Sequence, residues 1–269
     1  MSLFKLKLSD KINKALIENA YIKPTAIQAL EHKDIIARAQ TGSGKTASFV
    51  LPILNLWDNQ NFSGKPKIRC LVLTPTRELA LQVSTAFLTF SKYMNKKPKV
   101  VSVIGGESIG EQLLNIQKGC DVVVATTGRL LDILKKKQMD LSNLNFLVLD
   151  EADKMLDFGF EEELELLLQV LPKKRQNLLF SATYPAKMLN IASKITQNPI
   201  EISIENEETT VQSINQRVIE VNKENRSALL RHLIKEEKWE QVLVFMANKR
   251  SCDNIASKFR KYGFESESF

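Results

Sequence analysis

One short segment restricts the fold of this chain more than any other. It consists of Ala39, Gln40, Thr41, Gly42, Ser43, Gly44, Lys45 and Thr46. An apolar run, residues 34–38, precedes it, and a helical pattern begins at Lys45. Glycines let a backbone approach a ligand closely, and successive N–H groups at a helix N-terminus form a cradle for phosphate oxygens. The segment therefore predicts a strand, a phosphate-binding loop and a helix, in that order.

Short apolar runs alternate with helical patterns along most of the chain. The runs are residues 68–73, 99–104, 121–125, 144–149, 177–180 and 200–204. The helical patterns between them include residues 77–93, 108–118, 129–137 and 161–170. Continuous apolar runs are typical of strands that are covered on both faces. The alternation predicts an α/β fold, a doubly wound parallel sheet with helices on both faces.

Unusual polar segments follow the apolar runs, each at the carboxyl end of a run. They are residues 41–46, 75–80, 105–106, 126–129, 150–153 and 181–183. The carboxyl ends of parallel strands meet at one rim of a sheet, and ligands bind beyond that rim. We therefore expect these segments to line one continuous site.

The acidic run Asp150-Glu151-Ala152-Asp153 follows the apolar run 146–149. Acidic residues are also favoured at helix starts by the helix dipole, so the run is not diagnostic by itself. On the same rim as a phosphate loop, however, carboxylates can hold Mg²⁺ and orient a water molecule. The two segments together predict a site that hydrolyses a nucleoside triphosphate.

The pattern of the chain changes after residue 206. A polar stretch, residues 207–212, predicts a linker between a first domain, 1–206, and a second unit, 213–269. The second unit predicts strands at 214–221, 241–246 and from 264, and helices at 225–235 and 249–262. We expect this unit to be truncated and to expose apolar sheet edges, because so few elements cannot close a doubly covered sheet.

Composition narrows the class of protein only moderately. The 269 residues carry 38 Lys+Arg and 31 Asp+Glu, a formal charge of +7, which is compatible with a polyanionic partner. The three cysteines form no CxxC pair and the two histidines stand alone, which excludes a zinc site and indicates a reducing compartment. No apolar stretch approaches the ~18 residues that span a bilayer. We expect a cytoplasmic protein that makes no membrane contact.

The segments, in this order and spacing, resemble those of the DEAD-box RNA helicases. The matching segments are residues 21–28, 39–46, 75–80, 105–106, 126–129, 150–153, 181–183 and, in the second unit, 243–245. The resemblance covers essentially the whole chain. It implies two RecA-like domains, ATP and Mg²⁺ as cofactors, and single-stranded or short duplex RNA as the partner.

The nucleotide site implied by the resemblance begins in the phosphate loop. Lys45 would contact the β and γ phosphates, while Thr46 and Asp150 would hold Mg²⁺. Glu151 would orient and deprotonate the attacking water. Lys45, Asp150 and Glu151 are the expected catalytic residues.

Residues upstream of the loop are expected to select adenine. They are Tyr21, Lys23, Thr25 and Gln28. The Gln28 carboxamide offers one donor and one acceptor, which match N6 and N7 of adenine but not the two acceptors of guanine. Tyr21 or Phe4 would either stack on the base or serve as an ordinary core residue, and the sequence leaves both choices open.

The remaining rim segments are expected to bind RNA phosphates and sugars without reading the base sequence. The RNA candidates are Pro75, Thr76, Arg77, Gly105, Gly106, Thr126, Gly128 and Arg129. Asp153 is expected to couple the site either to Ser181 and Thr183 or to the second domain. Thr127 stands where the family usually carries proline. The lysine run 135–137 is more typical of a solvated helix end than of a binding patch.

Three functions remain open at this point. The first is the core of an ATP-dependent RNA helicase, the second an ATP-dependent RNA clamp that does not unwind, and the third a DNA helicase or another phosphate-loop ATPase. The family closes two domains on ATP and brings arginines to the γ-phosphate, and such arginines contribute 10³–10⁵ in rate. No matching arginine segment occurs before Phe269, so we expect this chain alone to bind ATP but to hydrolyse it slowly.

Overall fold

The chain forms two compact units, Met1–Glu208 and Thr209–Phe269. The computed structural model describes residues 8–19, 21, 33–39, 44–60, 64–203, 215 and 217–269. The expected linker, 207–212, lies outside these residues, so its boundaries stay a prediction. Each unit is considered by itself below.

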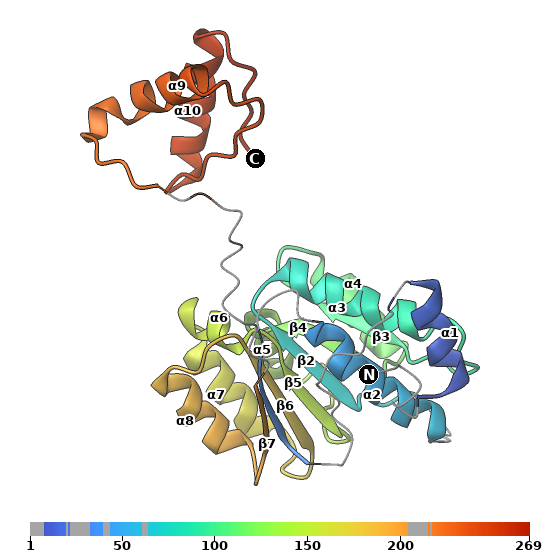
Figure 1. Ribbon diagram of the computed structural model, residues 1–269. Coiled ribbons are helices and arrows are strands. Elements are labelled where there is room, and N and C mark those ends of the chain that lie inside the picture. Colours follow the sequence, from blue (N-terminus) through green and yellow to red (C-terminus); the bar gives the residue numbers. More distant parts are fainter. Residues whose placement is uncertain are drawn as a thin grey trace. The chain divides into compact units, whose positions relative to one another are not determined.

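The first unit is built on a seven-stranded sheet (Figure 1). The strands are β1 Ile35–Arg38, β2 Cys70–Thr74, β3 Val100–Val103, β4 Val122–Thr126, β5 Phe146–Leu149, β6 Gln176–Ser181 and β7 Ile200–Ser203. Their order is β3-β4-β2-β5-β6-β1-β7, and all neighbouring strands pair in parallel. The predicted parallel sheet is confirmed, and each expected strand overlaps an observed one.

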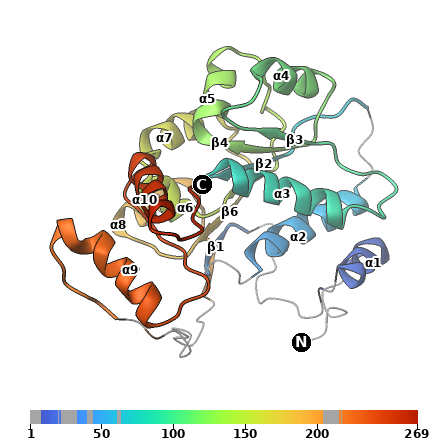
Figure 2. The same cartoon turned by 90° about the horizontal axis from the view of Figure 1, so that it is seen from above.

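Helices cover both faces of this sheet (Figure 2). They are α1 Asp10–Glu18, α2 Lys45–Asn59, α3 Arg77–Phe90, α4 Ile109–Gln117, α5 Thr127–Lys135, α6 Ala152–Asp157, α7 Glu161–Val170 and α8 Ala186–Ile195. The helices α1, α2 and α3 contribute to one apolar core, and α4 to α8 contribute to the other. Within the described part of the chain, no helix is both long and apolar enough to cross a membrane.

The strands supply both cores with alternate side chains. Val72 belongs to the core under α2 and α3, while its neighbours Leu71 and Leu73 belong to the opposite core. All five residues of β2 are buried, which explains why the sequence shows a continuous apolar run there. Burial of each large apolar side chain contributes about 1.5–3 kcal/mol, so the two cores together fix the sheet that carries the polar rim.

The second unit differs from its prediction. It contains a 3₁₀ turn, Lys223–Asn225, and the helices α9 Arg226–Glu236 and α10 Lys249–Lys261. The helices agree with expectation, but the described residues of the expected strands are irregular segments that pair with no neighbouring strand. The strand prediction is therefore wrong for these residues. Apolar patterns report that a segment can enter a sheet, whereas a strand also requires a neighbour for its backbone N–H and C=O groups.

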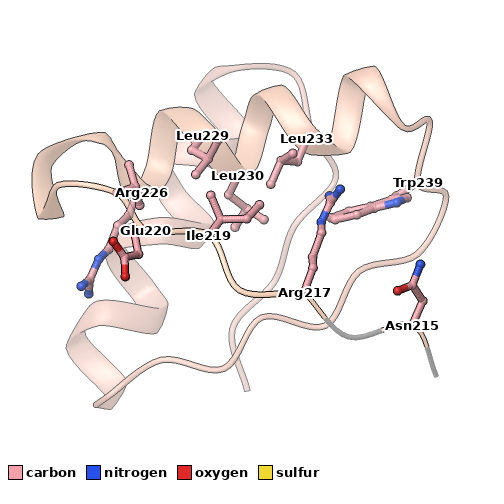
Figure 3. Close-up of a pocket in the computed structure, with 10 residues that line it drawn as sticks. Asn215, Arg217, Ile219, Glu220, Arg226, Leu229, Leu230, Leu233 and Trp239 are labelled. Carbon is pink, nitrogen blue, oxygen red and sulfur yellow. The ribbon is translucent and has the colours of Figure 1, made fainter.

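Apolar side chains of the second unit consequently face solvent or a wide hollow. Leu229, Leu230 and Leu233 of α9 point toward Ile219, beside a cavity of about 960 Å³ (Figure 3). The most exposed apolar side chains lie in the irregular segments, where Val218 is 94% exposed and Phe245 is 88% exposed. The unit does expose apolar surface, although not as the edge of a sheet.

Candidate functional site

Lys45 begins α2 directly beyond the carboxyl end of β1. Gly44 is the N-cap of α2 and has φ +84°, a left-handed conformation that glycine adopts without strain. Lys45 is only 7% exposed, and its Nζ has no hydrogen-bond partner among the described residues. A buried ammonium without a partner is costly. Its position at a helix N-terminus is therefore suited to an anion that supplies the missing acceptors.

Asp150 is a buried acidic residue at the carboxyl end of β5. It is 2% exposed, and its Oδ1 has no hydrogen-bond partner in the part of the chain that the structure describes. Burial raises the pKa of Asp150 to about 6. The positive charge of Lys45 acts in the opposite direction and lowers this pKa. The negative charge of Glu151 raises that pKa further. The three side chains thus share one electrostatic environment, although β6 lies between β5 and β1 in the sheet.

Glu151 connects β5 to α6 with an unusual backbone. Its φ is +50°, in the left-handed region, and its side chain is buried. A non-glycine residue in that region is strained, and such strain is found most often at functional sites. Lys154 Nζ lies 2.8 Å from Glu151 Oε2, one turn along α6. The carboxylate is thereby held at the rim by a cation that remains about half exposed.

Asp153 joins α6 to the end of β6. Its backbone N–H donates to Ser181 Oγ at 3.2 Å, and its Oδ2 accepts from both the N–H and the hydroxyl of Thr183 at 2.9 Å. Burial disfavours the charged carboxylate, but the hydrogen bonds from Thr183 and Ser181 outweigh it and lower the pKa of Asp153. The expected contacts with Ser181 and Thr183 are present, and the coupling role itself stays a prediction.

The predicted RNA residues lie along the same rim, after β2, β3 and β4. Thr76 caps α3 by accepting from the N–H of Leu79 at 3.2 Å, and Pro75 precedes it. The Arg77 guanidinium lies against Gly106, where an added Cβ would stand 1.7 Å from Nη1. The other segment begins at Thr126, the N-cap of α5, and includes Gly128 and Arg129. Arg129 Nη1 donates to the Glu107 carbonyl at 3.2 Å, so it reaches the loop that follows Gly105 and Gly106.

The structure does not bring every candidate to the rim. The ring of Tyr21 packs edge-on against Phe90, with centroids 5.2 Å apart. Phe90 ends α3, and a helix of this length places it about 20 Å from Arg77 at the rim. The structure therefore gives no support to base stacking by Tyr21.

Other nucleotide candidates lie partly outside the described residues. Ala39 is buried, its N–H donates to the Ser181 carbonyl at 3.0 Å, and Thr46 is half-buried in the first turn of α2. The candidates outside the description are Phe4, Lys23, Thr25, Gln28, Gln40, Thr41, Gly42 and Ser43.

Two residues near the site were not anticipated from the sequence. Lys154 could have been found, because it stands three residues after Glu151 on a helix. Tyr184 could not, because its partners come from distant segments. Its hydroxyl lies 3.2 Å from the carbonyl oxygens of Ala37 and Leu179, and burial raises its pKa strongly.

The acidic groups of the rim fit a magnesium site that needs few protein ligands. Among the residues that the structure describes, no group of three or more His, Cys, Asp or Glu is arranged to hold a metal. Mg²⁺ commonly takes one or two carboxylates and completes its shell with water and substrate phosphates. The orphaned oxygen of Asp150 meets that requirement.

Comparison with known proteins agrees with this geometry. The family model described as DEAD/DEAH box helicase matches residues 21–191. The ATP-dependent RNA helicase DeaD of Buchnera aphidicola subsp. Acyrthosiphon pisum is 42% identical over 97% of this chain and 43% of its own length. The DEAD-box ATP-dependent RNA helicase CshA of Bacillus licheniformis is 36% identical over 97% of this chain and 54% of its own length. The chain thus spans about half the length of these relatives.

A solved structure of the same kind matches the whole fold. It is the crystal structure of a DEAD box protein from the hyperthermophile Methanococcus jannaschii, with 35% identity and a TM-score of 0.69. The match covers 100% of this chain and 72% of that one. The seven-stranded parallel sheet is therefore the RecA-like sheet of such helicases, as the resemblance implied. From its sequence, its fold and the residues on its rim, the chain belongs to the DEAD/DEAH box helicase family.

Proposed function

We propose that the chain is the core of an ATP-dependent RNA helicase, which couples ATP binding and hydrolysis to local unwinding of RNA. One observation carries the proposal. A buried amine, Lys45 Nζ, and a buried carboxylate oxygen, Asp150 Oδ1, lie at one rim, and neither has a hydrogen-bond partner among the residues that the structure describes. Such a pair is suited to a ligand that has both anionic oxygens and an associated cation.

Each residue has a distinct task in this proposal. Lys45 supplies positive charge to the β and γ phosphates, and Thr46 and Asp150 hold Mg²⁺. When bound, the metal neutralises charge that develops on the transferred phosphoryl group. Glu151 orients the attacking water and accepts its proton. Its left-handed backbone and its ion pair with Lys154 support this role, since both fix the carboxylate.

RNA would bind along the neighbouring loops. Arg77 and Arg129 are cations at the carboxyl ends of β2 and β4, and the loop after β3 contacts both, through Gly106 at Arg77 and through the Glu107 carbonyl at Arg129. Contacts to phosphates and sugars give affinity without reading the base sequence, and contacts to the 2′-hydroxyl favour RNA over DNA. Selection of adenine by Gln28, with Lys23 and Thr25, remains part of the proposal. For the polypeptide of residues 1–269 alone, we propose ATP binding with slow turnover.

The test measures ATP hydrolysis with and without single-stranded RNA. Lys45→Ala is expected to abolish binding of a fluorescent ATP analogue. In an intact two-domain version, Glu151→Gln is expected to retain binding and to lower kcat by roughly 10²–10⁴, the usual contribution of a positioned base. Equal loss of nucleotide binding in both variants would show that these residues do not divide the work as proposed.

Two further measurements separate the proposal from its alternatives. Strand separation, measured beside the dwell time on RNA, distinguishes a helicase from a clamp, because a clamp would hold RNA without separating strands. Competition of poly-rU against poly-dT distinguishes an RNA enzyme from a DNA helicase. Equal competition by the two polymers would contradict the RNA assignment.

A further inference from the structure

A groove lies at the opposite rim of the sheet, between the C-terminal ends of α5 and α7. The two helices pack side by side (Figure 2). Each ends before the start of the next strand of the parallel sheet, so both end at the rim where the strands begin. The groove has a volume of about 580 Å³. The surface of the groove is mostly apolar, and its apolar lining includes Leu131, Leu134, Met139, Leu141, Val170 and Pro172. The groove lies away from the rim that carries Lys45 and Asp150.

The apolar surface continues from the groove along α7. Val170 is 60% exposed, and Leu166, one turn earlier on the helix, is 44% exposed. Residues four apart on a helix lie on one face. The groove and these two side chains therefore form an apolar stripe, and exposed apolar surface of this kind is typical of an interaction site.

Basic residues border the apolar stripe on both sides. Lys135, Lys136 and Lys137 follow α5, and Lys173 and Lys174 follow Pro172. None of these five lysines forms an ion pair within the described part of the chain. The acidic lining residue, Asp140, already accepts a hydrogen bond from the N–H of Ser142 at 2.8 Å. The border is thus positively charged, and its charge is complementary to that of an acidic partner.

The backbone of Lys137 allows a clean test of its side chain. Its φ is +54°, and its N–H donates to the Leu134 carbonyl at 2.9 Å, which ends α5 in a left-handed turn. Glycine is the residue that such a turn favours, because any side chain there is strained. The helix dipole alone would be served by Lys135 and Lys136, which are in the last turn and at the C-cap.

We propose that this groove binds an acidic, amphipathic segment of a partner protein. The apolar face of the segment would cover Val170 and enter the groove between α5 and α7, and its carboxylates would face the lysines. Nucleic acid fits less well, because it binds through phosphates and through stacking on aromatic rings, and no aromatic residue lines this groove. Binding here does not depend on the proposed function, since the opposite rim carries that site.

The test uses two labelled synthetic peptides of identical composition and fluorescence anisotropy. One peptide places leucines on a single face of a helix with glutamates elsewhere, and the other has the same residues scrambled. The amphipathic peptide is expected to bind the 269-residue chain at least about tenfold more tightly than the scrambled one. Val170→Glu is expected to weaken binding about tenfold, as loss of a central apolar anchor does.

The lysine variant has a closely matched control. Lys137→Gly removes one charge and relieves the left-handed strain, so the protein folds while peptide binding weakens by about fivefold. Lys238 has φ +53°, and it follows α9 with the same pattern of backbone hydrogen bonds. Lys238→Gly makes the identical change in the other unit and is expected to leave binding unchanged. Leu189→Glu, at an apolar residue of α8 that is 54% exposed, is the control for Val170→Glu.

Three outcomes would overturn the proposal. The first is equal binding of the two peptides, or no binding of either at about 1 mM. The second is equal weakening by Lys137→Gly and Lys238→Gly, which would indicate only general charge attraction. The third is displacement of the peptide by a short oligo-rU, which would assign the groove to nucleic acid. Nucleotide binding, measured in parallel with the ATP analogue, reports separately on the proposed function.

Discussion

The guanidinium of Arg77 lies against the backbone of Gly106, so close that a Cβ on that glycine would stand 1.7 Å from Arg77 Nη1. Arg77 begins α3 after β2, and Gly106 follows β3, although β4 separates these two strands in the sheet. Gly106 also has φ +77°. Glycine is therefore required here for two independent reasons, the close approach of Arg77 and the left-handed backbone.

Replacing Gly106 by alanine should displace Arg77 and strain the loop. We expect Gly106→Ala to lower the free energy of unfolding by about 1–2 kcal/mol and to weaken binding of single-stranded RNA. Binding of the ATP analogue without RNA should be unchanged. Urea unfolding and fluorescence anisotropy with a labelled oligo-rU provide the two measurements.

The neighbouring glycine provides the control. An added Cβ at Gly105 would meet nothing within 4 Å, and its φ is not positive. Gly105→Ala should therefore be close to neutral in both assays. If Gly106→Ala bound RNA as tightly as the unchanged protein, the position of Arg77 would not matter for RNA.

The buried carboxyl of Asp150 predicts a pH-dependent stability in the absence of nucleotide and divalent cations. Burial raises its pKa from 3.8 to about 6, so the folded chain holds this proton more tightly than the unfolded chain. Stability from this group is therefore complete below pH 3.8 and is lost as the pH rises to about 6. The pKa difference corresponds to about 3 kcal/mol.

Asp150→Asn isolates this effect, because an amide does not titrate. The variant should be more stable than the unchanged protein at pH 7, and the difference should shrink as the pH falls toward 4. Urea unfolding at several pH values measures it. A constant difference across this range would mean that Asp150 does not titrate as its burial implies.

Thr183 should stabilise the fold mainly while Asp153 is charged. The pKa of Asp153 is lowered in the folded chain, so its stabilising contribution is present above the ordinary value of 3.8 and is lost as the pH falls below it. Thr183→Val should cost about 1–2 kcal/mol at pH 7, since it removes a hydrogen bond to a charged group. The loss should diminish at pH 3.

Thr196→Val is the matched change without a carboxylate. The Thr196 hydroxyl donates to the Ala192 carbonyl at 2.8 Å. Its removal should lower stability by a similar amount at both pH values. If the loss of stability varied with pH in the same way in both variants, the charge of Asp153 would not be its cause.

The sequence predicted the sheet well because its signal is local. Val122–Thr126 and Phe146–Leu149 are apolar runs whose burial on both faces follows from their own composition. The direction of the strands then placed Lys45 and Asp150 on one rim, because every pairing is parallel. That part of the site could be predicted without knowing which strands are neighbours.

The rest depends on contacts between distant segments. Tyr184 reaches Ala37 and Leu179, and Tyr21 packs on Phe90, and neither partner can be identified from spacing along the chain. The strand prediction for the second unit failed for the same reason. Their apolar pattern is that of strands, but the described residues provide no neighbour to pair with them.

Thr127 should be replaceable by proline with a gain in stability. Thr127 is fully buried at the first position of α5, and its hydroxyl has no hydrogen-bond partner among the described residues. Proline suits the first position of a helix, because the N–H it lacks has no acceptor within that helix. The preceding residue, Thr126, is already extended, with φ −87° and ψ 144°, as a residue before proline must be.

We expect Thr127→Pro to raise the free energy of unfolding by about 1–2 kcal/mol, from the lost buried hydroxyl and the stiffer unfolded chain. Thr127→Val removes the hydroxyl without adding a ring, so it should give part of this gain. If Thr127→Pro were less stable than Thr127→Val in urea unfolding, the backbone conformation at residue 127 would be incompatible with proline.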